Sequence, residues 1–116
     1  MNQIKIKRIY EKPHENDGTR ILIDRLWPRG INKKEANIDS WLKNLAPSTE
    51  LRKFFSHDRQ KWNEFKYSYI NELKNKRELL DNIKNELIKN NITLLYGAKD
   101  EKCNNAVVLK EYLEVL

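Results

Sequence analysis

Cysteine is almost absent from this chain of 116 residues, since Cys103 is the only one and no disulfide can form within the chain. Disulfides are typical of oxidising compartments, so this scarcity favours a reducing one, and we expect a cytoplasmic protein. Met1 is not followed by an apolar run that would serve as a signal peptide. No stretch approaches the roughly 20 apolar residues of a membrane span, so we expect no membrane role.

Glycine and proline are also scarce, at three residues each, and the chain holds no internal repeat, low-complexity tract or linker. We therefore predict a single domain over residues 1–116. The sequence lacks a glycine-rich dinucleotide motif, a phosphate-binding loop and a zinc finger. Two scattered histidines and one cysteine do not form a zinc site, so we predict neither a metal nor a cofactor.

Positive charge is in excess, with 23 basic against 17 acidic residues and a net charge of +6. The 16 lysines and 14 asparagines fit compositional drift, although a basic chain also suits nucleic acid, anionic metabolites or an acidic partner. The seven arginines are more informative, because only a guanidinium binds carboxylate or phosphate in a bidentate manner. Four of them fall early in the chain: Arg8, Arg20, Arg25 and Arg29.

Hydrophobic periodicity predicts three strands and several helices. Residues 4–10 alternate as a half-buried strand does, and short apolar runs within 20–26 and 92–96 indicate covered strands. Helical spacing appears at 38–45, 51–55, 62–73, 79–88 and 106–116, with Ser48, Asp58 and either Asn104 or Asn105 as N-caps. We predict an α/β fold with a small, mainly parallel three-stranded sheet and helices on both faces. The link between the first two strands is barely long enough for a parallel crossover, so an antiparallel first pair stays open.

Several segments, taken together and in order, resemble the YeaO-like family, a branch of the domain of unknown function 488 family. They are Lys7-Arg8-Ile9-Tyr10, Asp24-Arg25-Leu26-Trp27-Pro28-Arg29-Gly30, Leu45-Ala46-Pro47-Ser48, Phe55-Ser56-His57-Asp58 and Asn104-Asn105-Ala106-Val107-Val108-Leu109. The resemblance implies a cytoplasmic α/β protein of about this length and implies no particular activity. The family pattern has histidine at position 103, where this chain has Cys103.

The main candidate site lies where the second and third predicted strands end. Ligands of parallel α/β sheets bind beyond the carboxyl ends of the strands, so Asp24 and Arg25 should meet the loop at 97–100. Arg25 and Arg29, with Arg8, would then clamp a phosphate or carboxylate, and Asp24 would orient one of the arginines. The structural alternative is that Arg8 pairs with Asp24 while Arg29 caps a helix.

Further candidates surround this edge of the sheet. Asn104 and Asn105 begin the last helix, where free N–H groups favour an anion, although plain capping is the simpler role. Trp27 and Tyr96 would wall the pocket. Cys103 lacks the arginine of the phosphatase pattern six residues later, where Leu109 stands, so we favour an inert thiol. Tyr10, at the end of the first strand, is a further candidate for the wall. Trp62, Phe65 and Tyr69 keep helical spacing, which indicates core packing.

We therefore expect binding of a small anionic ligand, such as phosphate, a carboxylate or a nucleotide, with or without catalysis. Asp24, His57 and Asp100 are the candidate catalytic groups; His57 is alternatively a structural residue at a helix start, bonded to Asp58 or to the backbone. A nucleic-acid-binding or regulatory module that uses a basic surface is the alternative. A protein-interaction role for the helical middle of the chain is a third reading.

Overall fold

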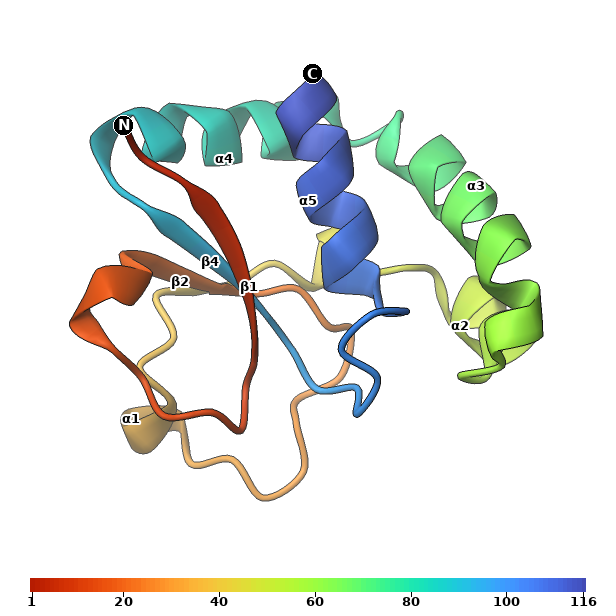
Figure 1. Ribbon diagram of the computed structural model, residues 1–116, viewed down its shortest axis with the longest axis horizontal. Helices are drawn as coiled ribbons and strands as arrows, with labels where there is room; N and C mark the ends of the chain where they lie inside the picture. Colours follow the sequence, from red (N-terminus) through yellow and green to blue (C-terminus); the bar gives the residue numbers. More distant parts are fainter.

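A four-stranded parallel sheet organises the computed structural model, which describes residues 1–116 (Figure 1). Its strands are β1 (Ile4–Arg8), β2 (Thr19–Leu22), β3 (Ser40–Trp41) and β4 (Ile92–Tyr96). They lie in the order β1-β4-β2-β3, and each neighbouring pair is parallel. The α/β class and the parallel sheet are confirmed, with one strand more than predicted.

The last strand in sequence lies in the middle of the sheet and resolves the open question about the first pair. β1 and β2 do not pair with each other, because β4 lies between them and pairs in parallel with both. The antiparallel alternative for the first two strands is therefore wrong. The short link at residues 9–18 needs only to cross one intervening strand.

The prediction of a helix over residues 38–45 is wrong. This segment contains β3 and then a 3-10 helix at Lys43–Leu45. Leu42 donates its backbone N–H to the Leu22 carbonyl at 2.9 Å, and the Trp41 indole donates to the Asp24 carbonyl at 2.7 Å. Pairing with β2 uses backbone groups of this segment that a helix would have bonded internally. The tertiary contacts with β2 therefore decide its conformation, and the helical spacing of its apolar residues does not.

Five helices complete the fold: α1 (Lys33–Ala36), α2 (Thr49–Phe55), α3 (Trp62–Leu73), α4 (Arg77–Lys89) and α5 (Asn105–Val115). Ser48 caps α2 and Asn104 caps α5, because their side chains accept the N–H groups of Leu51 and Val107. Asp58 caps a 3-10 helix (Arg59–Lys61) that leads directly into α3.

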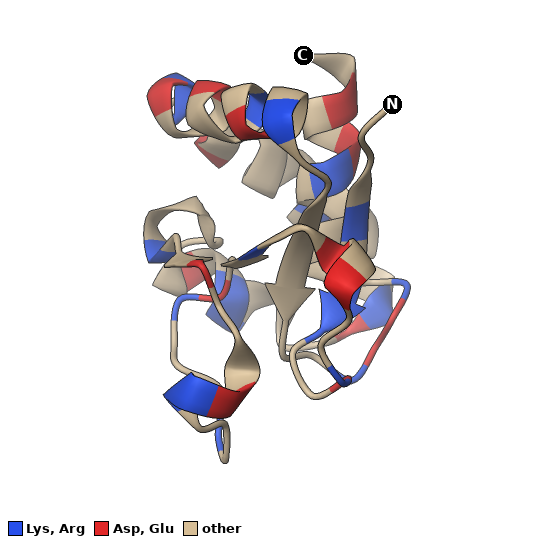
Figure 2. Cartoon of the chain, turned by 90° about the vertical axis from the view of Figure 1, so that its left-hand side faces the viewer, with Lys and Arg blue, Asp and Glu red and all other residues tan.

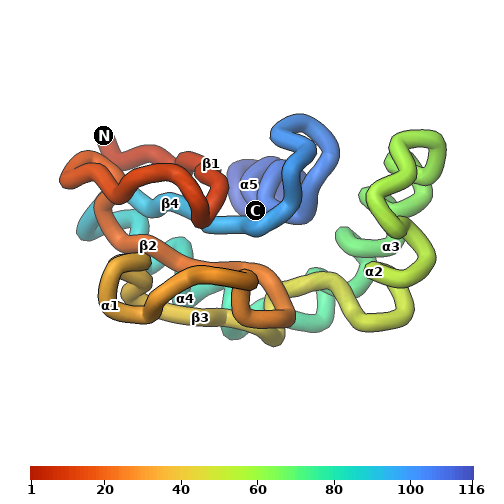
Figure 3. Tube along the Cα trace, turned by 90° about the horizontal axis from the view of Figure 1, so that it is seen from below, coloured from red at the N-terminus to blue at the C-terminus, as the bar shows by residue number.

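The two faces of the sheet bury different clusters. One face packs against α3, α4 and α5, and its core joins Ile21, Leu94 and Tyr69 with the apolar residues of those helices. The other face carries a smaller cluster around Leu22 and Leu95, covered by α1 and the chain before β3. Figures 1 and 3 both place α5 between the sheet and α3. Trp62, Phe65 and Tyr69 of α3 pack in or against the core as predicted, with the Phe65 ring stacked 4.3 Å from that of Phe55.

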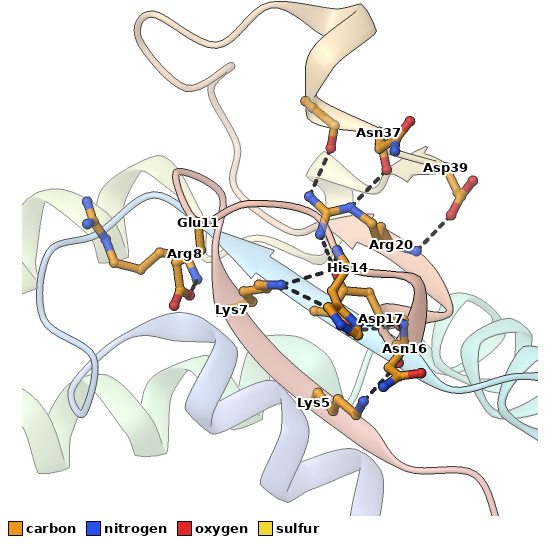
Figure 4. Close-up of polar contacts among 12 residues, drawn as sticks. Lys5, Lys7, Arg8, Glu11, His14, Asn16, Asp17, Arg20, Asn37 and Asp39 are labelled. Carbon is orange, nitrogen blue, oxygen red and sulfur yellow. Dashed lines mark hydrogen bonds and ion pairs between the residues drawn. The ribbon is translucent and has the colours of Figure 1, made fainter.

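A buried polar network fills part of the second face (Figure 4). Asp17, at the end of the 3-10 helix Glu15–Asp17, forms ion pairs with Arg20 at 2.5 Å and Lys7 at 3.2 Å. Arg20 is only 4% exposed and also donates to the carbonyls of Ala36 and Asn37. One of the four early arginines therefore ties the 9–18 link and α1 to the sheet.

Charges of both signs are mixed over the surface, and Figure 2 shows both signs interspersed along α4. None of the helices combines the length and the apolar character that crossing a bilayer requires.

Candidate anion site at the carboxyl edge of the sheet

A cavity of about 710 Å³ opens where β2 and β4 end. The residues after these strands, 24–26 and 97–98, form one side. Side chains of α2 and the turn after it form a second side, and residues 103–105 at the start of α5 form the third. The parallel pairing of β2 with β4 brings the first two loops together, since Leu22 and Leu95 are register partners. The predicted meeting of these loops is confirmed.

Asp24 is the only acidic residue that lines the cavity. Its carboxylate accepts the Gly97 backbone N–H at 2.8 Å and the Asn105 amide at 3.2 Å, and it forms no ion pair. Burial raises the pKa of Asp24, while these two hydrogen bonds and the charges of Arg52 and His57 oppose that rise. A perturbed carboxyl in a cavity is a common mark of a functional site.

Gly97 permits this arrangement. A Cβ at Gly97 would lie 3.0 Å from an oxygen of Asp24, so a side chain there would press on the carboxylate. The loop after β4 therefore approaches Asp24 through its backbone, and the N–H of Gly97 orients the acidic group.

Three cationic side chains line the same cavity: Arg25, Arg52 and Lys53. The guanidinium of Arg25 is anchored by two carbonyls, Pro47 at 3.1 Å and Ala46 at 3.3 Å, which leaves its Nη1 without a partner in the protein. Arg52 and Lys53, in the last turn of α2, form neither a side-chain hydrogen bond nor an ion pair within the protein. The positive charge of the cavity is thus largely uncompensated.

The two asparagines at the start of α5 have separate roles. Asn104 is buried, caps the helix through Val107 and donates to the Asp100 carbonyl, so its polar atoms are used within the protein. Asn105 donates to the Ile23 carbonyl and to Asp24, and its own amide oxygen has no protein donor. Both residues line the cavity, and the partial positive charge of the helix N-terminus faces the same space.

His57 lies at the cavity on an unusual backbone. Ser56 and His57 both adopt left-handed conformations, with φ of 44° and 58°, which is uncommon for residues other than glycine. The His57 side chain has no hydrogen-bond partner, and Asp58 caps Gln60 instead of bonding to the imidazole. The predicted structural pairing of His57 with Asp58 is therefore wrong.

Asp100 does not line the cavity and is engaged elsewhere. It accepts two hydrogen bonds from Arg59, at 2.7 and 2.9 Å, and the backbone N–H groups of Lys102 and Cys103. The Arg59 guanidinium holds the pKa of Asp100 well below its usual range, so this group is a poor proton acceptor near neutral pH. The pair joins the turn before α3 to the loop before α5, which carries Cys103 to the cavity.

Four other predicted site residues do not line the cavity: Arg8, Trp27, Arg29 and Tyr96. The Arg8 side chain donates to the Ala98 carbonyl and lies over the Tyr10 ring, so its predicted pairing with Asp24 is wrong. Trp27 donates to the Ile31 carbonyl and packs edge-on against Trp41. Arg29 is exposed in the loop after β2, and Tyr96 is buried in the main core.

Sequence reasoning missed Arg52 and Lys53, together with the apolar wall formed by Phe55 and Phe65. A charged residue in the last turn of a short amphipathic helix is normally expected to face solvent, so the sequence pattern did not mark these two residues as part of a site. The choice of arginine at position 52 was the available signal, because this chain otherwise uses lysine for most basic positions. No group of three or more histidine, cysteine or acidic side chains is placed to hold a metal ion.

The fold and the cavity together define a small parallel α/β protein with a basic pocket at the carboxyl edge of its sheet. Comparison with known proteins assigns the family. A family model described as "Inactive DUF488-N3 subclade" matches residues 3–116, and the chain belongs to the YeaO-like branch of the DUF488 family.

The chain is 41% identical over 113 residues to the uncharacterized protein YeaO of Escherichia coli K12, an alignment that covers 97% of this chain and 98% of that one. It is 39% identical over 71 residues to the uncharacterized proteins Rv3073c of Mycobacterium tuberculosis and Mb3100c of Mycobacterium bovis, covering 61% of this chain and 60% of theirs. No solved structure matches the chain.

Proposed function

We propose that this protein binds a small anionic ligand, with a phosphate or carboxylate group, in the cavity at the ends of β2 and β4. The observation that carries the proposal is the set of three cationic side chains, Arg25, Arg52 and Lys53, around a cavity with a single carboxylate. Unpaired guanidinium N–H groups and the N-terminus of α5 face the same space, and each favours an anion.

The size of the cavity supports a ligand of metabolite or nucleotide dimensions. Its volume of about 710 Å³ lies within the range of roughly 300–1,000 Å³ that is usual for small-molecule sites. Phe55, Phe65 and Leu26 supply an apolar wall for the carbon frame of such a ligand.

Binding without turnover is the form of the proposal that we favour. The matched subclade is described as inactive, and no nucleophile and base lie within hydrogen-bonding reach of each other at the cavity. Cys103 is a free thiol and His57 an unpartnered imidazole, and neither is hydrogen-bonded to the other. We retain the cytoplasm as the proposed location, since a single free cysteine suits a reducing compartment.

Calorimetric titration with inorganic phosphate and with AMP tests the proposal, using Arg25→Lys and the matched change Arg29→Lys. Arg29 lies outside the cavity, so its replacement should leave the dissociation constant unchanged. Arg25→Lys loses the planar fork and should weaken binding by about 10-fold, the effect of one charge-assisted hydrogen bond. Thermal melting of both variants checks that the fold is retained.

The nucleic-acid alternative predicts a different result when the titrations are repeated at increasing salt concentration. The affinity of a surface that binds through many phosphate contacts falls steeply with salt, and Arg25→Lys and Arg29→Lys weaken it equally. A wild-type protein that binds neither phosphate nor AMP, or variants that behave alike, would contradict the cavity as the site.

A further inference from the structure

The acidic group of the cavity is the feature that a simple anion site does not explain. Asp24 lies among three cationic lining residues, yet it pairs with none of them. It is held instead by two neutral donors, the Gly97 N–H at 2.8 Å and the Asn105 amide at 3.2 Å. The carboxylate is therefore oriented without being neutralised.

Asp24 has acceptor capacity left over. An ionised carboxylate offers about four lone-pair positions, and the protein occupies two of them. Since Asp24 lines the cavity, the remaining positions are available to a bound molecule. An acceptor that faces a binding site and lacks a protein donor is best satisfied by a hydroxyl or amino group of the ligand.

Electrostatics narrows the class of ligand. A carboxylate beside a bare phosphate would repel it, so a site built for inorganic anions alone gains nothing from Asp24. A ligand that carries its anionic group on one side and a hydroxyl on the other satisfies both the cations and the carboxylate. The apolar wall formed by Phe55 and Phe65 suits the carbon frame that would separate the two groups.

We propose that Asp24 is a specificity-determining residue that accepts a hydrogen bond from a hydroxyl of the ligand, and that the ligand class is the phosphate ester of a polyhydroxy compound. This inference rests on the proposed function of the cavity. Beyond that function, we expect the protein to bind a hydroxylated phosphate ester more tightly than a phosphate ester of equal charge that has no hydroxyl.

The experiment compares two probes with the same charge and the same number of carbon atoms, n-pentyl phosphate and ribose 5-phosphate, by calorimetric titration at constant ionic strength. The wild-type protein should bind ribose 5-phosphate at least about 10-fold more tightly, because only this probe offers hydroxyl groups to the charged acceptor. Asp24→Asn should reduce that ratio toward one while binding n-pentyl phosphate at least as tightly as before, since the repulsion is gone. Asp81→Asn, on the exposed face of α4, is the matched control and should retain the wild-type ratio.

Each other outcome decides against the inference in a distinguishable way. A wild-type protein that binds both probes equally overturns the role of Asp24 but leaves the anion site in place. Equal losses for both probes in Asp24→Asn would show that Asp24 only maintains the shape of the cavity. Failure of the wild type to bind either probe overturns the proposed function as well. If Asp24→Asn does not fold, the wild-type ratio alone decides, since it requires no variant.

Discussion

Replacing Asp17 by alanine should cost more stability than any exposed substitution, because Asp17 neutralises a buried guanidinium. Asp17 and Arg20 are 5% and 4% exposed, and their ion pair measures 2.5 Å. Removal of one partner of a buried pair leaves an uncompensated charge and costs about 3–5 kcal/mol. Lys7, the other partner, is 19% exposed at its side chain and is able to turn toward water, so it adds little.

This free energy converts into a large change of melting temperature. For 116 residues, an unfolding entropy of about 2.1 cal/mol/K per residue corresponds to about 4 °C per kcal/mol. Asp17→Ala should therefore melt about 12–20 °C below the wild type in a thermal scan followed by circular dichroism. The same change at Asp81, in an exposed pair with Arg77, should cost about 0.5 kcal/mol or less.

A double-mutant cycle with Arg20→Met separates the ion pair from other effects. Once the guanidinium is removed, loss of Asp17 should cost much less, which gives a coupling free energy above about 1 kcal/mol. Additive losses, or an Asp17→Ala variant as stable as Asp81→Ala, would refute the reasoning. If Asp17→Ala does not fold, Asp17→Asn keeps the shape of the side chain and provides the comparison.

Three further predictions concern the pH dependence of the Asp17 network, the close approach of Gly97 to Asp24, and the cap of α5. Burial alone would raise the pKa of Asp17, but the His14 N–H, Lys7 and Arg20 outweigh it and lower the pKa. Its stabilisation is thus complete above the unfolded pKa of about 3.9 and is lost as pH falls through the lower folded pKa. The difference in melting temperature between wild type and Asp17→Ala should shrink below about pH 4, and a constant difference would count against this assignment. Gly97→Ala places a methyl group 3.0 Å from Asp24 and should cost about 1 kcal/mol in urea unfolding; a neutral effect would mean that the loop relaxes freely. Asn104→Ala removes the α5 cap and should cost about 1–2 kcal/mol in the same assay, and a loss below about 0.3 kcal/mol would contradict the capping role.

The sequence was sufficient to predict the local features of the fold. The apolar run at 92–96 matches β4 throughout, and Ser48 and Asn104 cap the predicted helices, because strand burial and N-capping depend on neighbouring residues. β3 could not be predicted in this way. Two residues form it only because β2 lies alongside, and the spacing around Trp41 fits a helix equally well.

The candidate site was predictable only where strand ends define it. Asp24 and Arg25 follow β2 directly, so the rule for parallel sheets places them at the correct edge. Arg29 lies four residues further into a loop whose course no local pattern fixes, and it lies outside the cavity. Arg52 reaches the cavity from a helix that is distant in sequence, which only the tertiary arrangement of α2 shows.

Mapping a phosphate titration by amide chemical shifts in ¹⁵N-labelled protein tests the central claim most directly. We expect saturable shifts concentrated at Gly97, Asn105 and Arg25, whose backbone or side chains surround the cavity. Amides around the exposed Arg29 and along α4 should stay unchanged. Shifts that spread evenly over basic surface residues without saturation, or no shifts at the edge of β2 and β4, would contradict it.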